Sequence, residues 1–196
     1  MKRTALRALA TGMILLTAGC WLPDEYKGEI DVKSDSTYQA SYTGKLTAVE
    51  VAAALAQHKF AEGDAGYTKA MNDEVAKARQ DPGTKSIDPI GAGMVQATYA
   101  TDGRLASGKL MYDLLGVQVA GNTVTIQSID ISEGNRKGIS QQLKLKSQGD
   151  ICIKTELKVV KSNADTMPGM LSSCYGWKLD ALSGKRLMIV MEKPAA

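Results

Sequence analysis

The sequence is poor in the residues that most often carry out chemistry. Its 196 residues include one histidine, His58, and no Cys-x-x-Cys pair. A Ser–His–acid triad or a Cys–His pair would have to use His58, and no Gly-x-Ser-x-Gly motif accompanies it. A lone histidine near the end of a predicted helix is more often a surface or capping residue. We therefore expect a protein that is not an enzyme, with no catalytic residues and no metal site.

The sequence also lacks a complete cofactor motif. The stretch GAGMVQ, residues 91–96, begins like a dinucleotide-binding loop. It has neither the third glycine nor a helical pattern after it, and both are needed to hold a pyrophosphate at a helix N-terminus. We expect no cofactor.

Basic residues do not outnumber acidic residues outside residues 1–19. The formal net charge is +3, but residues 20–196 hold 21 basic and 21 acidic residues. A nucleic-acid-binding surface needs a clear basic excess, so we expect no nucleic-acid partner. The balance is −5 over residues 20–132 and +5 over 133–196. This asymmetry indicates either solvated strand faces or a basic surface facing an anionic partner, such as lipid head groups or an acidic protein.

No apolar run is long enough to cross a bilayer as a helix. The uncharged stretch of residues 8–18 is about half of the roughly 20 residues that a span needs. Lys2, Arg3 and Arg7 precede it, and small residues follow it. That order is typical of a secretory signal peptide. Its end, TAGC at residues 17–20, resembles the bacterial lipobox, whose final cysteine is diacylated and becomes the new N-terminus.

The lipobox resemblance implies a lipid anchor at Cys20. The signal peptide is then residues 1–19, and several acyl chains hold the protein to a membrane far better than one does. Thr17 departs from the usual leucine, with Leu16 one position earlier. Trp21 stands where Gram-negative lipoproteins of the inner membrane tend to have aspartate, which implies the outer membrane and a domain facing the periplasm. The alternative is an ordinary secretory signal followed by an unrelated cysteine.

Two further cysteines, Cys152 and Cys174, form an even pair. In an oxidising envelope compartment such a pair indicates a disulfide, which would close a loop of about 23 residues. A redox or metal-binding pair is the alternative. The single histidine and the lack of Cys-x-x-Cys spacing favour the structural disulfide.

The hydrophobic pattern of the first half predicts a hairpin and two helices. Period-two alternation in residues 28–34 and 37–43 predicts an N-terminal β-hairpin. A capping box at Thr47 and Glu50 predicts a helix that begins there. An apolar stripe at helical spacing in residues 67–79 predicts a second helix.

The second half predicts strands. From Gly93 onward, short alternating runs are separated by glycine-containing turns, and the Asp102-Gly103 pair predicts a tight hairpin. Together the elements predict an α+β fold: an antiparallel β-sheet or open barrel of about six to eight strands, with the two helices inserted after the N-terminal hairpin. We expect a lipidated tether at residues 20–27 and a single domain at 28–194.

Few residues suggest a functional surface. Tyr175 and Trp177 lie on one face of a predicted strand, and they are the best candidates for a contact surface. Asp130 and Glu133 lie beside the stretch GNRKG, where they indicate either a cation-binding cluster or a solvated turn. The other aromatic residues on the predicted strands fit either a core or a groove.

Three functions remain open from the sequence. The first is an outer-membrane-anchored periplasmic lipoprotein with a non-catalytic binding or accessory role in an envelope assembly, held by its lipid and by an envelope protein partner. The second is a small-ligand or lipid-binding lipoprotein that encloses an apolar cavity. The third is a cell-wall hydrolase, for which Asp130, Glu133 and His58 are the candidate residues.

The anchor assignment has a direct test. Replacing the acylated residue in Cys20→Ser removes the sulfur to which the lipid is attached, so the protein should no longer incorporate labelled palmitate and should remain a precursor or become soluble. The measurement is metabolic labelling followed by fractionation of membranes. Cys20→Ser protein that still takes up palmitate would contradict the assignment.

Overall fold

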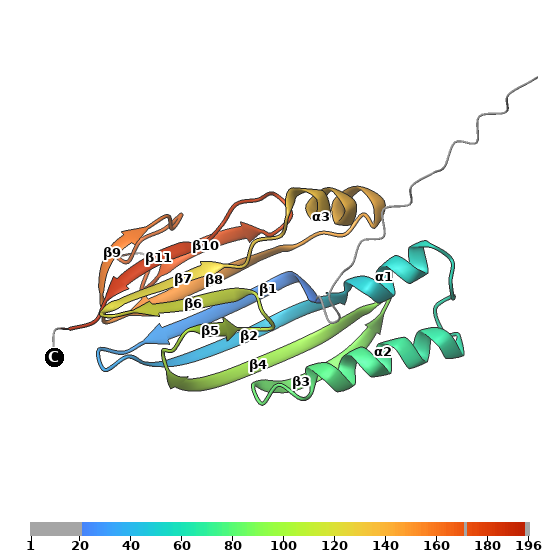
Figure 1. Cartoon of the computed structure of the whole chain (residues 1–196), viewed down its shortest axis with the longest axis horizontal. Helices are drawn as coiled ribbons and strands as arrows, with labels where there is room; N and C mark the ends of the chain where they lie inside the picture. The colour runs from blue at the N-terminus through green and yellow to red at the C-terminus, as the bar shows by residue number, and fades with distance from the viewer. Residues whose placement is uncertain (1–20, 171, 195–196) are drawn as a thin grey trace, which may run out of the picture.

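The computed structural model describes residues 21–170 and 172–194, so the expected signal peptide and Cys20 lie outside the described residues. Two β-sheets make up most of it, with two helices after the first hairpin and a short helical segment later (Figure 1). The strands are β1 (Trp21–Val32), β2 (Thr37–Ala48), β3 (Thr84–Gly91), β4 (Met94–Arg104), β5 (Gly108–Leu110), β6 (Leu115–Ala120), β7 (Thr123–Ser128), β8 (Gln148–Thr155), β9 (Lys158–Ser162), β10 (Tyr175–Asp180) and β11 (Met188–Glu192). The helices are α1 (Val49–Ala56), α2 (Ala65–Ala78), α3 (Glu133–Lys137) and the π-helical turn η1 (Gly138–Gln142).

The strands are arranged in a sheet of six, in the order β10-β8-β1-β2-β4-β3, and a sheet of five, in the order β5-β6-β7-β11-β9. All neighbours pair antiparallel except β1 and β8, which run parallel. The predicted α+β class is confirmed. The prediction of one sheet or barrel with six to eight strands is wrong in number, because the described chain has eleven strands in two open sheets.

The predicted number of strands was too low because some apolar runs that were predicted as one strand contain a turn. The run LMYDLLGVQVA looks like one strand, but Met111, Tyr112 and Asp113 have φ angles of +54°, +55° and +64°. These left-handed conformations end β5 and let β6 pair back on it. The turn has no glycine or proline, and Asp113 is its one common turn residue, so the signal for it in the sequence is weak.

The N-terminal hairpin is confirmed. β1 pairs antiparallel with β2, and the alternating residues Ile30, Val32, Ala40 and Tyr42 are buried. The expected tether at residues 20–27 is wrong from Trp21 onward, because β1 begins there. The register shifts between Asp24 and Lys27, and this bulge breaks the period-two pattern that would have revealed a strand.

The two predicted helices are present, but the start of the first was predicted wrongly. Thr47 does not cap a helix; it pairs with Met94 as part of β2, and α1 follows Ala48 without a side-chain cap. The tertiary pairing overrides the local capping pattern. The stripe predicted for the second helix is confirmed, because Tyr67, Met71, Val75 and Ala78 are all buried in α2.

The tight hairpin predicted at Asp102 and Gly103 is wrong. Asp102 and Gly103 lie within β4 and pair with β2. A turn that was not predicted from the sequence joins β3 to β4 at Gly91, Ala92 and Gly93, whose φ angles are +94°, +51° and +75°. This is the stretch that begins like a dinucleotide-binding loop, and its glycines serve a β-turn.

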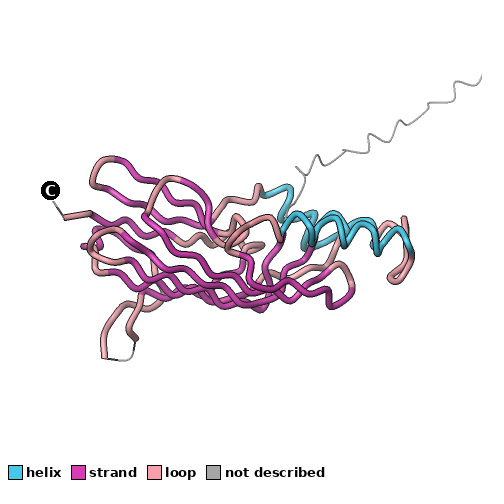
Figure 2. The backbone as a smooth tube through the Cα atoms, turned by 90° about the horizontal axis from the view of Figure 1, so that it is seen from below, coloured by secondary structure: helices cyan, strands magenta, loops and turns pink. Residues whose placement is uncertain are grey.

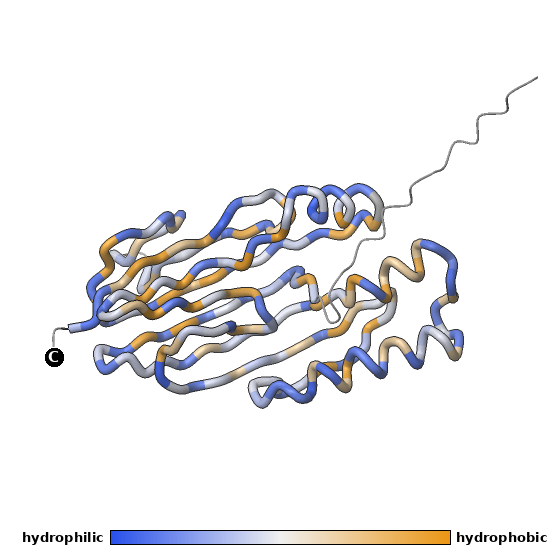
Figure 3. Tube along the Cα trace, in the orientation of Figure 1, coloured by the Kyte–Doolittle hydropathy of each residue, from blue (hydrophilic) through white to orange (hydrophobic). Residues whose placement is uncertain are grey.

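The two sheets pack face to face, as the views along two axes show (Figure 1, Figure 2). Apolar residues recur along the strands of both sheets (Figure 3). Buried residues from both sheets form one continuous core. α1 and α2 extend beyond one end of the sheets (Figure 2). No helix among residues 21–170 and 172–194 is long and apolar enough to cross a membrane.

The predicted disulfide is present between Cys152 in β8 and Cys174 just before β10, with the two Cα atoms 5.7 Å apart. It ties β10 to β8 and holds the base of the segment between β9 and β10. Met167 and Met170 in that segment are exposed at 60% and 104% of their full area.

Removing the disulfide should destabilise the domain. The bridge spans 22 residues in sequence, and constraining a loop of that size in the unfolded chain stabilises the folded state by about 3 kcal/mol. The double variant Cys152→Ala/Cys174→Ala should therefore lose about 3 kcal/mol of unfolding free energy in urea denaturation followed by circular dichroism. The folded wild type should leave both thiols closed to alkylation without reductant. Ready alkylation of Cys152 would contradict the bridge.

Candidate functional site

A cleft of about 530 Å³ lies between the two sheets at the end of the molecule where β1 begins. Its walls come from four segments far apart in sequence: the start of β1, the turn between β5 and β6, the stretch from the end of β7 into α3, and the end of β10 with the loop to β11. β8 pairs with both β1 and β10, which brings the first and last of these segments together. The other two segments come from the five-stranded sheet, which shares one core with the first sheet. Such a volume lies within the roughly 300–1,000 Å³ of small-molecule sites.

The inner wall of the cleft is apolar. Leu22 and Tyr26 of β1 and Leu179 of β10 line it and are buried, and Leu114 from the β5–β6 turn lines it and is half-buried. Ile129, just after β7, lines the cleft with 40% of its area exposed. Covering such an exposed apolar side chain with a ligand removes apolar surface from water, which favours binding.

The hydroxyl of Tyr26 is the one buried side-chain polar atom without a hydrogen-bond partner among the described residues. Tyr26 is 2% exposed and lines the cleft. Its ring lies over Gly149 of β8, where an added Cβ would overlap the ring, so only glycine leaves room for it. Burial, with a smaller contribution from the Asp150 carboxylate, raises the pKa of the Tyr26 phenol well above its usual range. The phenol is therefore neutral, and its hydroxyl is a buried donor without a hydrogen-bond partner among the described residues.

An aromatic row connects the cleft with the core. The Tyr26 ring stacks on Tyr42 with centroids 5.7 Å apart, and Tyr112 meets Tyr42 edge-on at 5.7 Å. Tyr112 also lines the cleft and lies 5.3 Å from Tyr99. Tyr42 and Tyr99 are thus part of the core, and Tyr26 and Tyr112 lie where the core meets the cleft.

The mouth of the cleft is rich in cations. Lys109, Arg136, Lys185 and Arg186 line it, together with Asp113 and Asp130. Asp130 lies between the two arginines, with one oxygen 3.6 Å from Arg136 Nη1 and the other 2.5 Å from Arg186 Nη2.

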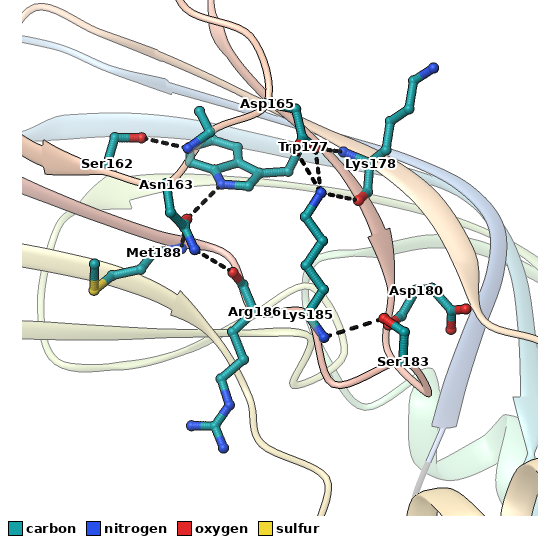
Figure 4. Close-up of polar contacts among 11 residues, drawn as sticks. Ser162, Asn163, Asp165, Trp177, Lys178, Asp180, Ser183, Lys185, Arg186 and Met188 are labelled. Atoms are coloured by element: carbon teal, nitrogen blue, oxygen red, sulfur yellow. Dashed lines mark hydrogen bonds and ion pairs between the residues drawn. The ribbon is translucent and has the colours of Figure 1, made fainter.

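A polar cluster behind the mouth fixes the β10–β11 loop (Figure 4). The Asn163 amide oxygen accepts from Trp177 Nε1 at 2.9 Å and from the Met188 amide at 2.8 Å, and its nitrogen donates to the Arg186 carbonyl at 2.7 Å. Lys185 Nζ lies 2.6 Å from Asp165 and 3.1 Å from the Lys178 carbonyl (Figure 4). These contacts hold the backbone that carries Arg186.

The structure separates the candidate hydrolase residues. Asp130 lies at the cleft mouth between two arginines. Glu133 is exposed and forms an ion pair with Lys137 one helical turn on. His58 lies after α1 with a φ of +53°, and it is not among the residues that line the cleft. Asp130 and Glu133 therefore belong to a solvated, ion-paired turn at the start of α3.

The predicted contact surface at Tyr175 and Trp177 is wrong for Trp177. Its ring is 1% exposed and belongs to the core between the sheets. Its indole nitrogen is satisfied internally by Asn163. Tyr175 is half-buried at the start of β10. The alternation that placed both rings on one face was correct, but that face is the inner one.

No group of three or more His, Cys, Asp or Glu residues in the described ranges could hold a metal ion. The sequence did not reveal the cleft, because its lining residues come from four separate segments. The one signal in the sequence was the basic excess of residues 133–196, which includes Arg136, Lys185 and Arg186.

Comparison with known proteins gives little. No family model and no curated protein matches the chain. One similar solved structure is the NMR structure of the folded domain of the Mycobacterium tuberculosis LppM protein. The TM-score is 0.44 with 10% sequence identity, and the match covers 87% of this chain and 90% of that one. A similarity this low identifies no family.

Phenylalanine substitutions of Tyr26 and Tyr42, whose rings stack on each other, should change the unfolding free energy in opposite directions. Tyr26→Phe removes a buried polar group without a partner, so it should raise the unfolding free energy of the ligand-free protein by on the order of 1 kcal/mol. Tyr42→Phe removes a hydroxyl that donates to the Lys45 carbonyl at 2.8 Å, so it should lower that free energy by about 1 kcal/mol. Urea denaturation of both variants measures the difference. An equal loss in both would show that the Tyr26 hydroxyl has a partner.

Proposed function

We propose that the protein is a non-catalytic binding lipoprotein whose cleft takes up an amphiphile. The apolar part of the ligand lies between the sheets, and its polar end faces the cationic mouth. The observation that carries this proposal is the 530 Å³ cleft, whose lining residues include Tyr26, the residue with a buried and unpartnered hydroxyl. Of the functions predicted from the sequence, this proposal prefers the lipid-binding alternative to the accessory role that was predicted first.

The chemistry of the cleft supports an amphiphile over a purely polar ligand. Leu22, Leu179 and Ile129 offer apolar surface, and each CH₂ group that leaves water is worth about 0.8 kcal/mol. A polar group on the ligand that accepts from Tyr26 would remove the cost of that hydroxyl, which is on the order of 1–3 kcal/mol. Both contributions favour a molecule with an apolar chain and a polar group.

The side chains around the cleft support binding over catalysis. Its lining includes neither histidine nor cysteine. The Asp130 carboxylate is engaged by two guanidinium groups, and Lys109 and Lys185 each hold an acidic partner. A nucleophile with a general base within hydrogen-bond reach, the minimum for covalent catalysis, is not found among these lining residues.

We place this binding role at the membrane. The lipobox-like TAGC stretch supports an anchor at Cys20, and Trp21 in place of aspartate supports the outer membrane with the domain in the periplasm. Handling an amphiphile there is one form of the accessory role expected from the sequence. An envelope protein partner stays a prediction.

A variant that fills the cleft tests the function. Ala181 lines the cleft, whereas Ala106 is exposed in a loop and does not. Ala181→Trp should weaken binding of the neutral apolar dye N-phenylnaphthylamine to the full-length protein at least tenfold, because the indole occupies the ligand's space. Ala106→Trp should bind as the wild type does. The measurement is dye fluorescence, with mass spectrometry of molecules that co-purify with each protein.

The same experiment can overturn the proposal. Wild-type protein that neither binds the dye nor carries a co-purifying amphiphile would exclude an amphiphile-binding cleft. Unchanged dye binding in Ala181→Trp would place the apolar site elsewhere.

A further inference from the structure

We propose that Arg136 and Arg186 bind the phosphate of an anionic phospholipid drawn from the membrane leaflet that holds the protein. The inference rests on the proposed amphiphile-binding function and names the head group that the cleft selects.

The two arginines are the only cations lining the mouth without a carboxylate of their own among the described residues. Lys109 pairs with Asp113, and Lys185 lies 2.6 Å from Asp165. Arg136 and Arg186 instead share the single carboxylate of Asp130. One negative charge cannot neutralise two guanidinium groups, so the mouth carries an uncompensated positive charge that attracts an anion.

The fold restrains the Arg136 side chain and the backbone that carries Arg186. The guanidinium of Arg136 lies over Gly184, where an added Cβ would be 3.2 Å from Arg136 Cζ. Gly184 has a φ of +82°, which favours glycine. The backbone of Arg186 is held by the Asn163 amide. Preorganised donors lose less freedom when a ligand binds.

Phosphate is the anion that suits a pair of guanidinium groups. Each guanidinium presents five N–H donors in a planar fork, which matches the oxygens of a phosphate in a bidentate contact. Asp130 uses only part of this donor set. A phosphate oxygen can therefore join Asp130 or displace it from one of the arginines.

The start of β1 indicates where the ligand comes from. Trp21 lines the cleft and already pairs with Ala48 in the sheet. Cys20 directly precedes Trp21 in the sequence. With Cys20 acylated, the cleft is joined to the membrane surface without a spacer. A phosphate at the mouth then belongs to a lipid whose acyl chains are already beside the cleft, whereas a free phosphate would leave the apolar wall uncovered.

The test compares lipids that differ only in the head group. Full-length protein is incubated in detergent with phosphatidylglycerol, phosphatidylcholine or diacylglycerol of matched chains, and bound lipid is counted by native mass spectrometry. We expect phosphatidylglycerol to bind about tenfold more tightly than phosphatidylcholine, equivalent to about 1.4 kcal/mol. Arg136→Gln/Arg186→Gln should abolish the preference, and Arg136→Lys/Arg186→Lys should keep part of it.

Two further variants separate this effect from misfolding. Lys137→Gln removes a cation of the same helix that pairs with Glu133 and does not line the cleft, so it should leave the preference unchanged. Asp130→Asn removes the carboxylate that competes for both arginines, so it should tighten phosphatidylglycerol binding several-fold. A damaged fold cannot produce such a gain.

The outcomes distinguish the two proposals. Equal binding of all three lipids would overturn the phosphate site while keeping the amphiphile-binding cleft. Binding of none of them would overturn both. Inorganic phosphate that displaces phosphatidylglycerol and binds as tightly alone would make the ligand a free phosphate and overturn the membrane source. Loss of preference in the arginine pair together with a gain in Asp130→Asn would establish the site.

Discussion

The parallel pairing of β1 with β8 is the constraint on which the rest of the structure depends. It joins residues 26–32 to residues 149–155, and so closes the first part of the chain against the last. β8 also carries β10, through strand pairing and through the disulfide from Cys152. Once β1, β8 and β10 are adjacent, the start of β1 must lie beside the end of β10. The other two segments of the cleft come from the five-stranded sheet, which shares one core with this sheet.

The cleft lies at an end of the molecule because the middle is full. Trp177, Ile151 and Ile153 from one sheet and Ile126 and Ile189 from the other are fully buried between the layers. Packing at that density leaves no room for a ligand. At the end where β1 starts, Gly149 and Gly184 leave room for the Tyr26 ring and the Arg136 guanidinium, which lie over them. Binding capacity is thus concentrated where the core gives way to loops.

The sequence predicts the features whose signal is local. The N-terminal hairpin and α2 follow from periodicity, and the disulfide follows from Cys152 and Cys174 being the one remaining pair. Prediction failed where distant pairing overrides the local pattern, as at Thr47, which pairs with Met94 in a sheet instead of capping α1. It failed at residues 21–27 because a bulge breaks the alternation. The cleft could not be found at all, since no periodicity reports which turns meet at one end of two sheets.

The position of β1 also determines how the domain resists mechanical force. β1 is held on both sides, by β2 from Trp21 to Val32 and by β8 from Tyr26 to Val32. A pull on the residues ahead of Trp21 runs along the strand, so it loads these hydrogen bonds in shear and they share the tension. A strand at the edge of a sheet, pulled across its ladder, would open one bond at a time. Stress applied through the N-terminal end is therefore spread over two ladders of the six-stranded sheet.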